Sequence, residues 1–138
     1  MIASVSIKNT TSSFMPDDDW TNIQDDTTGN FNADVVFRTF GKFFSPGETS
    51  YTFSWTGSVY ASASIVAYSG VDTTSPVMTS AVQINPSAST TYTAPSVTTT
   101  AANALVVATY GVSGYTAMTA GSGMTRRVYE PYAVSTAA

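Results

Sequence analysis

A single leucine, Leu105, in a chain of 138 residues is the feature that most constrains what this sequence can fold into. The apolar 43% of the chain is instead mostly Val, Ala, Tyr, Phe and Ile. Such β-branched, aromatic and small side chains suit a pleated, half-buried surface better than a helix. Only 10% of the residues are charged, which is too few to build the polar outer faces of amphipathic helices. The composition therefore predicts an all-β protein.

The spacing of turn residues predicts how the strands are arranged. Turn signals recur roughly every 8–12 residues, as in sandwiches and barrels, and the length suits a single domain over 1–138. We expect an antiparallel β-sandwich, jelly-roll-like or Ig-like, with about eight or nine strands. The predicted strands are 2–7, 20–25, 33–40, 50–56, 58–68, 77–84, 89–97, 103–112 and 125–134.

The segment 50–56 (SYTFSWT) has the clearest alternation in the chain. Aromatic and polar residues take turns along it, which predicts a strand with one buried face. The buried residues would be Tyr51, Phe53 and Trp55. The next strand carries small residues on one face, which leave room for those rings. These small residues are Ala61, Ala63 and Ala67.

Two turns are predicted from their residue types. In "SPGE" (45–48), proline stands at the second position of a β-turn and glycine at the third, where a positive φ is required. In "IVAYSGVDTTSPV" (65–77), Gly70 permits a bend, and the Asp72 carboxylate can accept hydrogen bonds from nearby backbone amides. We interpret this second segment as a structural corner and not as a catalytic site.

Several kinds of chemistry are excluded by the residues that the chain lacks. There is no histidine and no cysteine, so His-based catalysis, disulfides and thiolate metal sites are ruled out. No phosphate-binding glycine motif is present, and we expect neither an enzyme nor a cofactor. The net charge of −4 argues against nucleic acid as a partner. No apolar run reaches the roughly 18–20 residues of a membrane span, and the first residues lack the pattern of a signal peptide.

Five of the nine acidic residues lie in one window, 17–26. Clustered acids on a polar loop usually form a solvated rim, and that is the first interpretation. The alternative is a calcium site, because Ca²⁺ prefers carboxylate oxygens, although the spacing matches no EF-hand loop. The candidate ligands are Asp17, Asp19, Asp25 and Asp26.

Three aromatic residues are candidates for an interface. Phe43 and Phe44 precede the Ser-Pro-Gly turn, where an exposed apolar pair would mark a contact with another subunit. Tyr60 is the third candidate. A sugar-binding module would instead need such rings on one flat face or groove, so a carbohydrate-binding role stays open.

Several segments resemble a β-sandwich module of bacteriophage structural proteins and of large bacterial secreted or surface proteins. The residues 50–77 are similar to the family pattern "TFTW", a Gly-Ser turn, "I-x-A-Y" and "SGVDTTNP", with Ser75 where Asn is commoner. The segment 92–111 is similar to "tAPSVTTT…N-x-LVV", and 123–130 to a "GMTER"-like stretch. The segment 16–23 is similar to a Pro…Gly-Trp-Thr segment, with Asp19 where Gly is commoner.

The resemblance covers most of 16–130 and implies a structural role, with no catalytic residues to carry over. Family members usually begin earlier and often run on further, so this chain is either a compact variant or part of a longer one. In the second case, a neighbour could supply a missing edge strand.

The resulting hypothesis is a non-enzymatic virion structural protein, such as a phage capsid decoration, fibre or tail-surface component. Its partners would be other virion proteins or copies of itself in a homo-oligomer, and its location the virion surface or the extracellular space. The alternative is a carbohydrate-binding or adhesive module of a bacterial surface or secreted protein, with a cell-surface glycan as its partner.

Overall fold

The computed structural model describes residues 1–8, 15–16, 19–26, 35–57, 60–84, 87, 89–112 and 118–129. These residues contain six strands and no helix. The strands are β1 (Ile2–Lys8), β2 (Met15–Pro16), β3 (Thr21–Asp26), β4 (Val35–Gly41), β5 (Phe53–Ser54) and β6 (Tyr60–Val66). The all-β fold class is therefore confirmed for the described residues.

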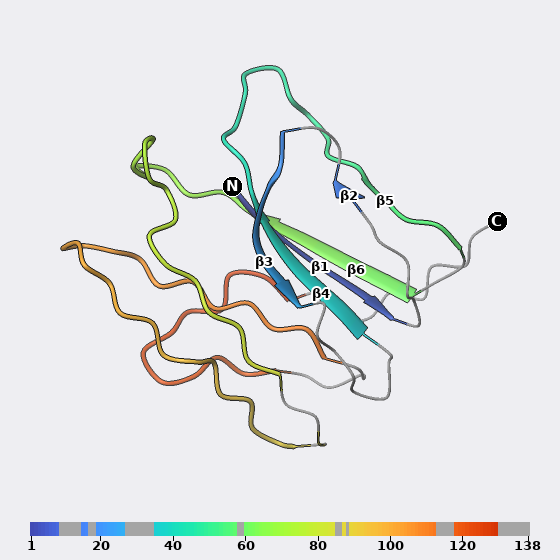
Figure 1. The fold of residues 1–138 in the computed structure, drawn as a ribbon, viewed down its shortest axis with the longest axis vertical. Helices are drawn as coiled ribbons and strands as arrows, with labels where there is room; N and C mark the ends of the chain where they lie inside the picture. Colours follow the sequence, from blue (N-terminus) through green and yellow to red (C-terminus); the bar gives the residue numbers. More distant parts are fainter. Residues whose placement is uncertain are drawn as a thin grey trace.

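A four-stranded antiparallel sheet, in the order β3-β4-β1-β6, forms the centre of the molecule (Figure 1). Residue Ile2 of β1 lies opposite Gly41 and Val66, and Lys8 lies opposite Val35 and Tyr60. The pairing of β3 with β4 shifts register between Asn22 and Gln24. A second, two-stranded sheet pairs β2 with β5.

The core lies on one face of the four-stranded sheet. Alternate residues of β1 (Ala3, Val5 and Ile7) are fully buried there, and β4 contributes Phe40 and β6 Ala61. The aromatic residues Trp20, Phe53 and Trp55 pack against this cluster. Burial of apolar area stabilises the fold by about 25 cal/mol per Å², so this side supplies much of the stability of the sheet.

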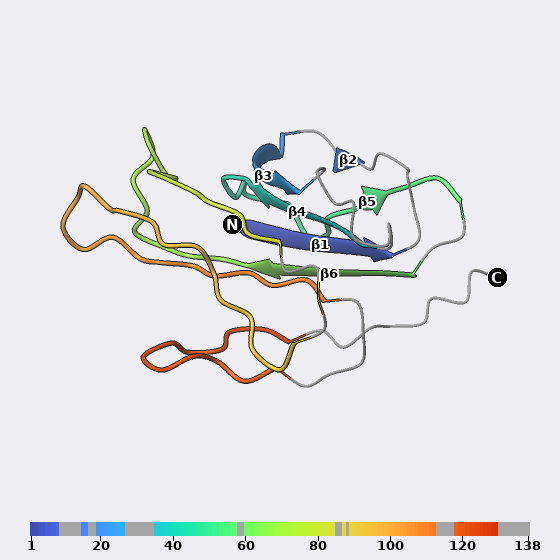
Figure 2. The same ribbon diagram turned by 60° about the horizontal axis from the view of Figure 1, so that its bottom comes forward.

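The later part of the chain contacts the other face of the sheet. Thr39, which points away from Phe40 because neighbouring strand residues face opposite sides, shares a 3.3 Å hydroxyl contact with Thr109. Gly111 lies so close to Phe37 that a Cβ on the glycine would meet the ring at 2.5 Å. The Ser80 hydroxyl also donates to the Gln24 side chain of β3 at 3.0 Å. Apart from such contacts, the described part of the chain from residue 71 onward runs largely outside the sheet (Figures 1 and 2).

The strands predicted in the first half are mostly confirmed. β1, β3, β4 and β6 fall within the predicted segments 2–7, 20–25, 33–40 and 58–68, give or take one residue at an end. Of 50–56, only Phe53–Ser54 is a strand, but Tyr51, Phe53 and Trp55 are half-buried while the residues between them are exposed. The alternation thus predicted the buried face correctly.

One prediction about small residues is correct only in part. Ala61 lies in the core below the aromatic residues, whereas Ala63 and Ala67 are exposed. Of the other residues near the end of β6, Ile65 packs against the core, and Ala67 lies beyond the strand.

The strands predicted in the second half are not observed among the described residues. The segments 77–84, 89–97, 103–112 and the described part of 125–134 hold no strand. Their patterns favour strands, but a strand needs a neighbouring ladder, and these segments have none there. The described residues thus show six strands, and the expected sandwich of about eight or nine is not observed in them.

Both predicted turns have the expected geometry. The Glu48 amide donates to the Ser45 carbonyl at 3.2 Å, with Gly47 at a φ of 96°. At the corner, Gly70 has a φ of 74°, and the Asp72 carboxylate accepts hydrogen bonds from the amides of Thr74 and Ser75. The described part of the chain contains no helix long and apolar enough to cross a bilayer.

Candidate functional site

The candidate site is the loop between β4 and β5, residues 42–51, which we call the Phe43–Phe44 loop. Phe43 is 52% exposed and Phe44 59% exposed, although both are large apolar side chains. They follow the end of β4 after Lys42, and the Ser45–Glu48 turn comes next. Adjacent exposed rings of this kind mark a surface suited to contact with another molecule.

The Glu48 carboxylate holds the loop closed. Its Oε1 lies 2.7 Å from the Lys42 ammonium, and its Oε2 accepts hydrogen bonds from the Ser45 amide and the Tyr51 hydroxyl, both at 3.1 Å. The ammonium also lies 5.6 Å from the centre of the Tyr51 ring. Glu48 therefore joins the beginning, middle and end of the loop.

Both ends of the loop are anchored in the fold. At its beginning, the Lys42 amide donates to the Met1 carbonyl at 3.1 Å, and the Met1 amino group donates to the Lys42 carbonyl at 2.6 Å. At its end, the Tyr51 ring packs edge-on against Trp20, with centroids 5.6 Å apart. Trp20 also lies 5.6 Å from Phe53, which in turn contacts Phe40 of the core.

The charges of the loop stabilise each other's ionised forms. The hydrogen bond from Lys42 is the main reason that the pKa of Glu48 is lowered, and the Ser45 amide adds to it. The same hydrogen bond raises the pKa of Lys42. Burial, and then the hydrogen bond to Glu48, raises the pKa of the Tyr51 phenol. Near neutral pH, Lys42 and Glu48 are therefore charged, and the Tyr51 phenol keeps its proton.

This arrangement gives a rigid apolar contact surface. A phenylalanine carries roughly 200 Å² of surface, so each ring leaves roughly 100 Å² to be covered by a partner. At about 25 cal/mol per Å², covering one ring would contribute about 2.5 kcal/mol to binding. Because the loop is already fixed, little of that gain is lost to ordering it on binding.

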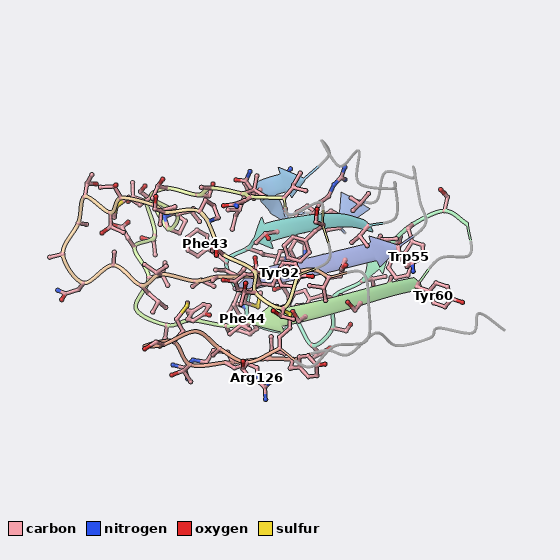
Figure 3. The ribbon with its side chains drawn as sticks, turned by 90° about the horizontal axis from the view of Figure 1, so that it is seen from below. Phe43, Phe44, Trp55, Tyr60, Tyr92 and Arg126 are labelled. Atoms are coloured by element: carbon pink, nitrogen blue, oxygen red, sulfur yellow. The ribbon has the colours of Figure 1, made fainter. Side chains whose placement is uncertain are left out.

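Tyr60, the third predicted interface residue, lies at the other end of the sheet. It is 44% exposed, but it pairs with Lys8 at the far end of β1, whereas the Phe43–Phe44 loop leaves the sheet beside Met1. Figure 3 shows Tyr60 near Trp55, away from Phe43 and Phe44. At about 3.3 Å per residue, the length of β1 separates the two places by about 20 Å. The three rings therefore do not form one platform.

The candidate calcium ligands are not brought together in the described residues. Asp17 lies outside them, as do the side chains of Asp25 and Asp26. Asp19 is exposed at a turn before β3, and Asp25 and Asp26 end that strand, about 20 Å further along. One calcium ion binds its oxygens at 2.3–2.6 Å, so it cannot reach both ends of β3. The described residues contain no group of three or more potential ligands.

Lys42 and Glu48 were not predicted to be site residues, and Tyr51 was predicted only as a buried residue of the strand 50–56. A signal was present, because Lys42 and Glu48 are the only charged residues between positions 39 and 71 and they flank the Ser-Pro-Gly turn. Isolated opposite charges on either side of a tight turn are a reason to expect an ion pair across it.

No protein-family model, no curated protein and no solved structure matches this chain.

Proposed function

We propose that this protein is a non-enzymatic structural component of a virion surface, a phage capsid decoration, fibre or tail-surface protein that acts through protein–protein contacts. The observation that carries the proposal is the Phe43–Phe44 loop, in which two exposed rings are held in place by Glu48. A fixed apolar projection of this kind suits permanent attachment to another protein. The resemblance of 50–77, 92–111 and 123–130 supports the choice of a virion.

The proposed fold is a jelly-roll-like or Ig-like sandwich around the observed sheet. Its second layer would come from the later segments, whose residues favour strands, once those segments acquire neighbouring strands. Partners of the protein on the particle would be other virion proteins and copies of the chain itself. The site of action would be the virion surface or the extracellular space.

The carbohydrate-binding alternative has less support from the arrangement of the rings. A sugar platform needs two or three rings on one surface, and Tyr60 lies at the opposite end of the sheet from Phe43 and Phe44. Glycan binding is therefore an alternative that the experiment below distinguishes from attachment to particles.

The test is to fractionate the native source on a density gradient and to follow the chain by mass spectrometry. The proposal predicts that the chain travels with dense particles that contain nucleic acid. Recovery only with cells or in the soluble medium would reject it, and binding to a glycan array that is lost in a Phe43→Ala variant would establish the alternative.

A further inference from the structure

We propose that the segment 103–112 is a self-association strand, which pairs with the same segment of a second copy of this chain. This inference specifies the partner named above as a copy of the chain itself. It rests on different residues from the Phe43–Phe44 loop, and it holds whether or not the chain belongs to a virion.

The first observation is that the segment is apolar on both sides and exposed. Leu105 is 67% exposed, Val106 54%, Val107 38% and Tyr110 42%. Successive residues of an extended chain point to opposite sides, so exposure of 105, 106 and 107 means that neither side of this stretch is covered by the chain itself. A partner is needed to bury these side chains.

The second observation concerns the backbone of the segment. Among the described residues, 103–112 belong to no strand and make no backbone–backbone hydrogen bond. An extended run with free N–H and C=O groups and β-branched side chains is a template for pairing with another chain.

The third observation is that one end of the segment is fixed to the sheet. Thr109 contacts the Thr39 hydroxyl at 3.3 Å, and Gly111 packs against the Phe37 ring. From there, the segment extends away from the sheet toward the turn at 101–103, within the orange part of the chain (Figures 1 and 2). The exposed stretch is therefore anchored to the sheet at its Thr109–Gly111 end.

The segment offers a compact group of apolar side chains for an interface. Leu105, Val106, Val107 and Tyr110 lie within six consecutive positions, and each is more than a third exposed. Two copies of the segment paired as strands would bury these side chains against each other on both sides of the pair.

The chemistry of the segment favours a second copy as its occupant. Residues 103–112 contain no charged side chain, so two copies of the segment meet without repulsion. When a segment pairs with itself across a two-fold axis, the strands run antiparallel, which is the direction already used throughout the observed sheets. An unrelated partner would have to match an apolar surface that carries no charge to guide it.

The test uses the full chain in size-exclusion chromatography with light scattering, at about 1 to about 100 µM. We expect wild type to reach twice the 14.5 kDa chain mass, and Leu105→Glu and Val106→Glu each to weaken association at least tenfold. Both side chains are more than half exposed, so these changes leave the monomer folded. Thr52→Glu, which adds the same charge at an exposed position near β5, is the control and should stay dimeric.

Hydrogen exchange of the amides 104–108 provides the second measurement. Protection that appears only when the chain dimerises supports the pairing. Protection at concentrations where the chain is monomeric would overturn it, because the segment would then pair within its own chain. A wild type that stays monomeric at about 100 µM would overturn it as well. A Phe43→Ala variant that loses particle binding but still dimerises would show that particle attachment and the self-association of 103–112 use different residues.

Discussion

Glu48 Oε1 lies 2.7 Å from Lys42 Nζ, and this contact closes the loop that exposes Phe43 and Phe44. The same carboxylate accepts hydrogen bonds from Ser45 and Tyr51, so removing its charge disconnects three parts of the loop at once. We therefore expect Glu48→Gln to speed hydrogen exchange of the amides of 43–45 and 47–48 without changing exchange in β1. Thr49→Ala, an exposed neighbour, is the control. Equal exchange in wild type and Glu48→Gln would show that the carboxylate does not hold the loop.

Acid should destabilise the protein through two carboxylates. The pKa of Glu48 is lowered mainly by the Lys42 hydrogen bond, and that of Asp72 by the amides of Ser75 and Thr74. Below the ordinary values of 4.5 and 3.8, the unfolded chain binds more protons than the folded one, so stability falls as the pH falls through the folded pKa values. The melting temperature between about pH 6 and about pH 3 should therefore drop less in Glu48→Gln and Asp72→Asn than in wild type. Parallel curves for all three proteins would contradict this assignment.

The first half of the fold follows from local patterns, and the second half does not. Alternation identified the buried sides of Phe53 and Trp55, and the spacing of turn residues located β1, β4 and β6, because these features depend on residues close in sequence. The register that places Tyr60 opposite Lys8 depends on a neighbour more than fifty residues away, so the sequence pattern could not separate Tyr60 from Phe43.

The segment 103–112 also shows that a local pattern does not determine the pairing partner of a strand. Its composition favours a strand, and the described structure leaves it without a ladder. A strand pattern reports that a segment can pair, but not which chain supplies its neighbour. That missing information is what the self-association experiment measures.

The core should be sensitive to loss of volume at Ile7. This side chain is fully buried in the core cluster next to Val5 along β1, so Ile7→Ala removes buried area and leaves a cavity. We expect a loss of about 2–4 kcal/mol in the free energy of unfolding, measured by urea denaturation. Val82→Ala, at a 41% exposed position, should change it by less than about 0.5 kcal/mol. An equal loss of unfolding free energy in Ile7→Ala and Val82→Ala would show that Ile7 does not belong to the core.

Two glycines provide a matched test of the contact between the later chain and the sheet. A Cβ at Gly111 would lie 2.5 Å from the Phe37 ring, whereas a Cβ at Gly121 would meet nothing within 4 Å, and neither glycine has a positive φ. Gly111→Ala should therefore cost about 1–3 kcal/mol by forcing Phe37 or the segment 109–111 to move. Gly121→Ala should be neutral or slightly stabilising. If both variants melt alike, the segment does not pack on β4 as described.

Co-sedimentation of the purified protein with the particles from its native source tests whether the Phe43–Phe44 loop attaches the protein to them. The comparison is between wild type and the double variant Phe43→Ala/Phe44→Ala. Both rings are more than half exposed, so the double variant should keep the melting temperature of wild type. At about 2.5 kcal/mol per ring, roughly 70-fold weaker binding is expected for each substitution, which leaves the double variant in the soluble fraction while wild type sediments with the particles. Equal sedimentation of both proteins, or a wild type that never sediments with particles, would contradict the account.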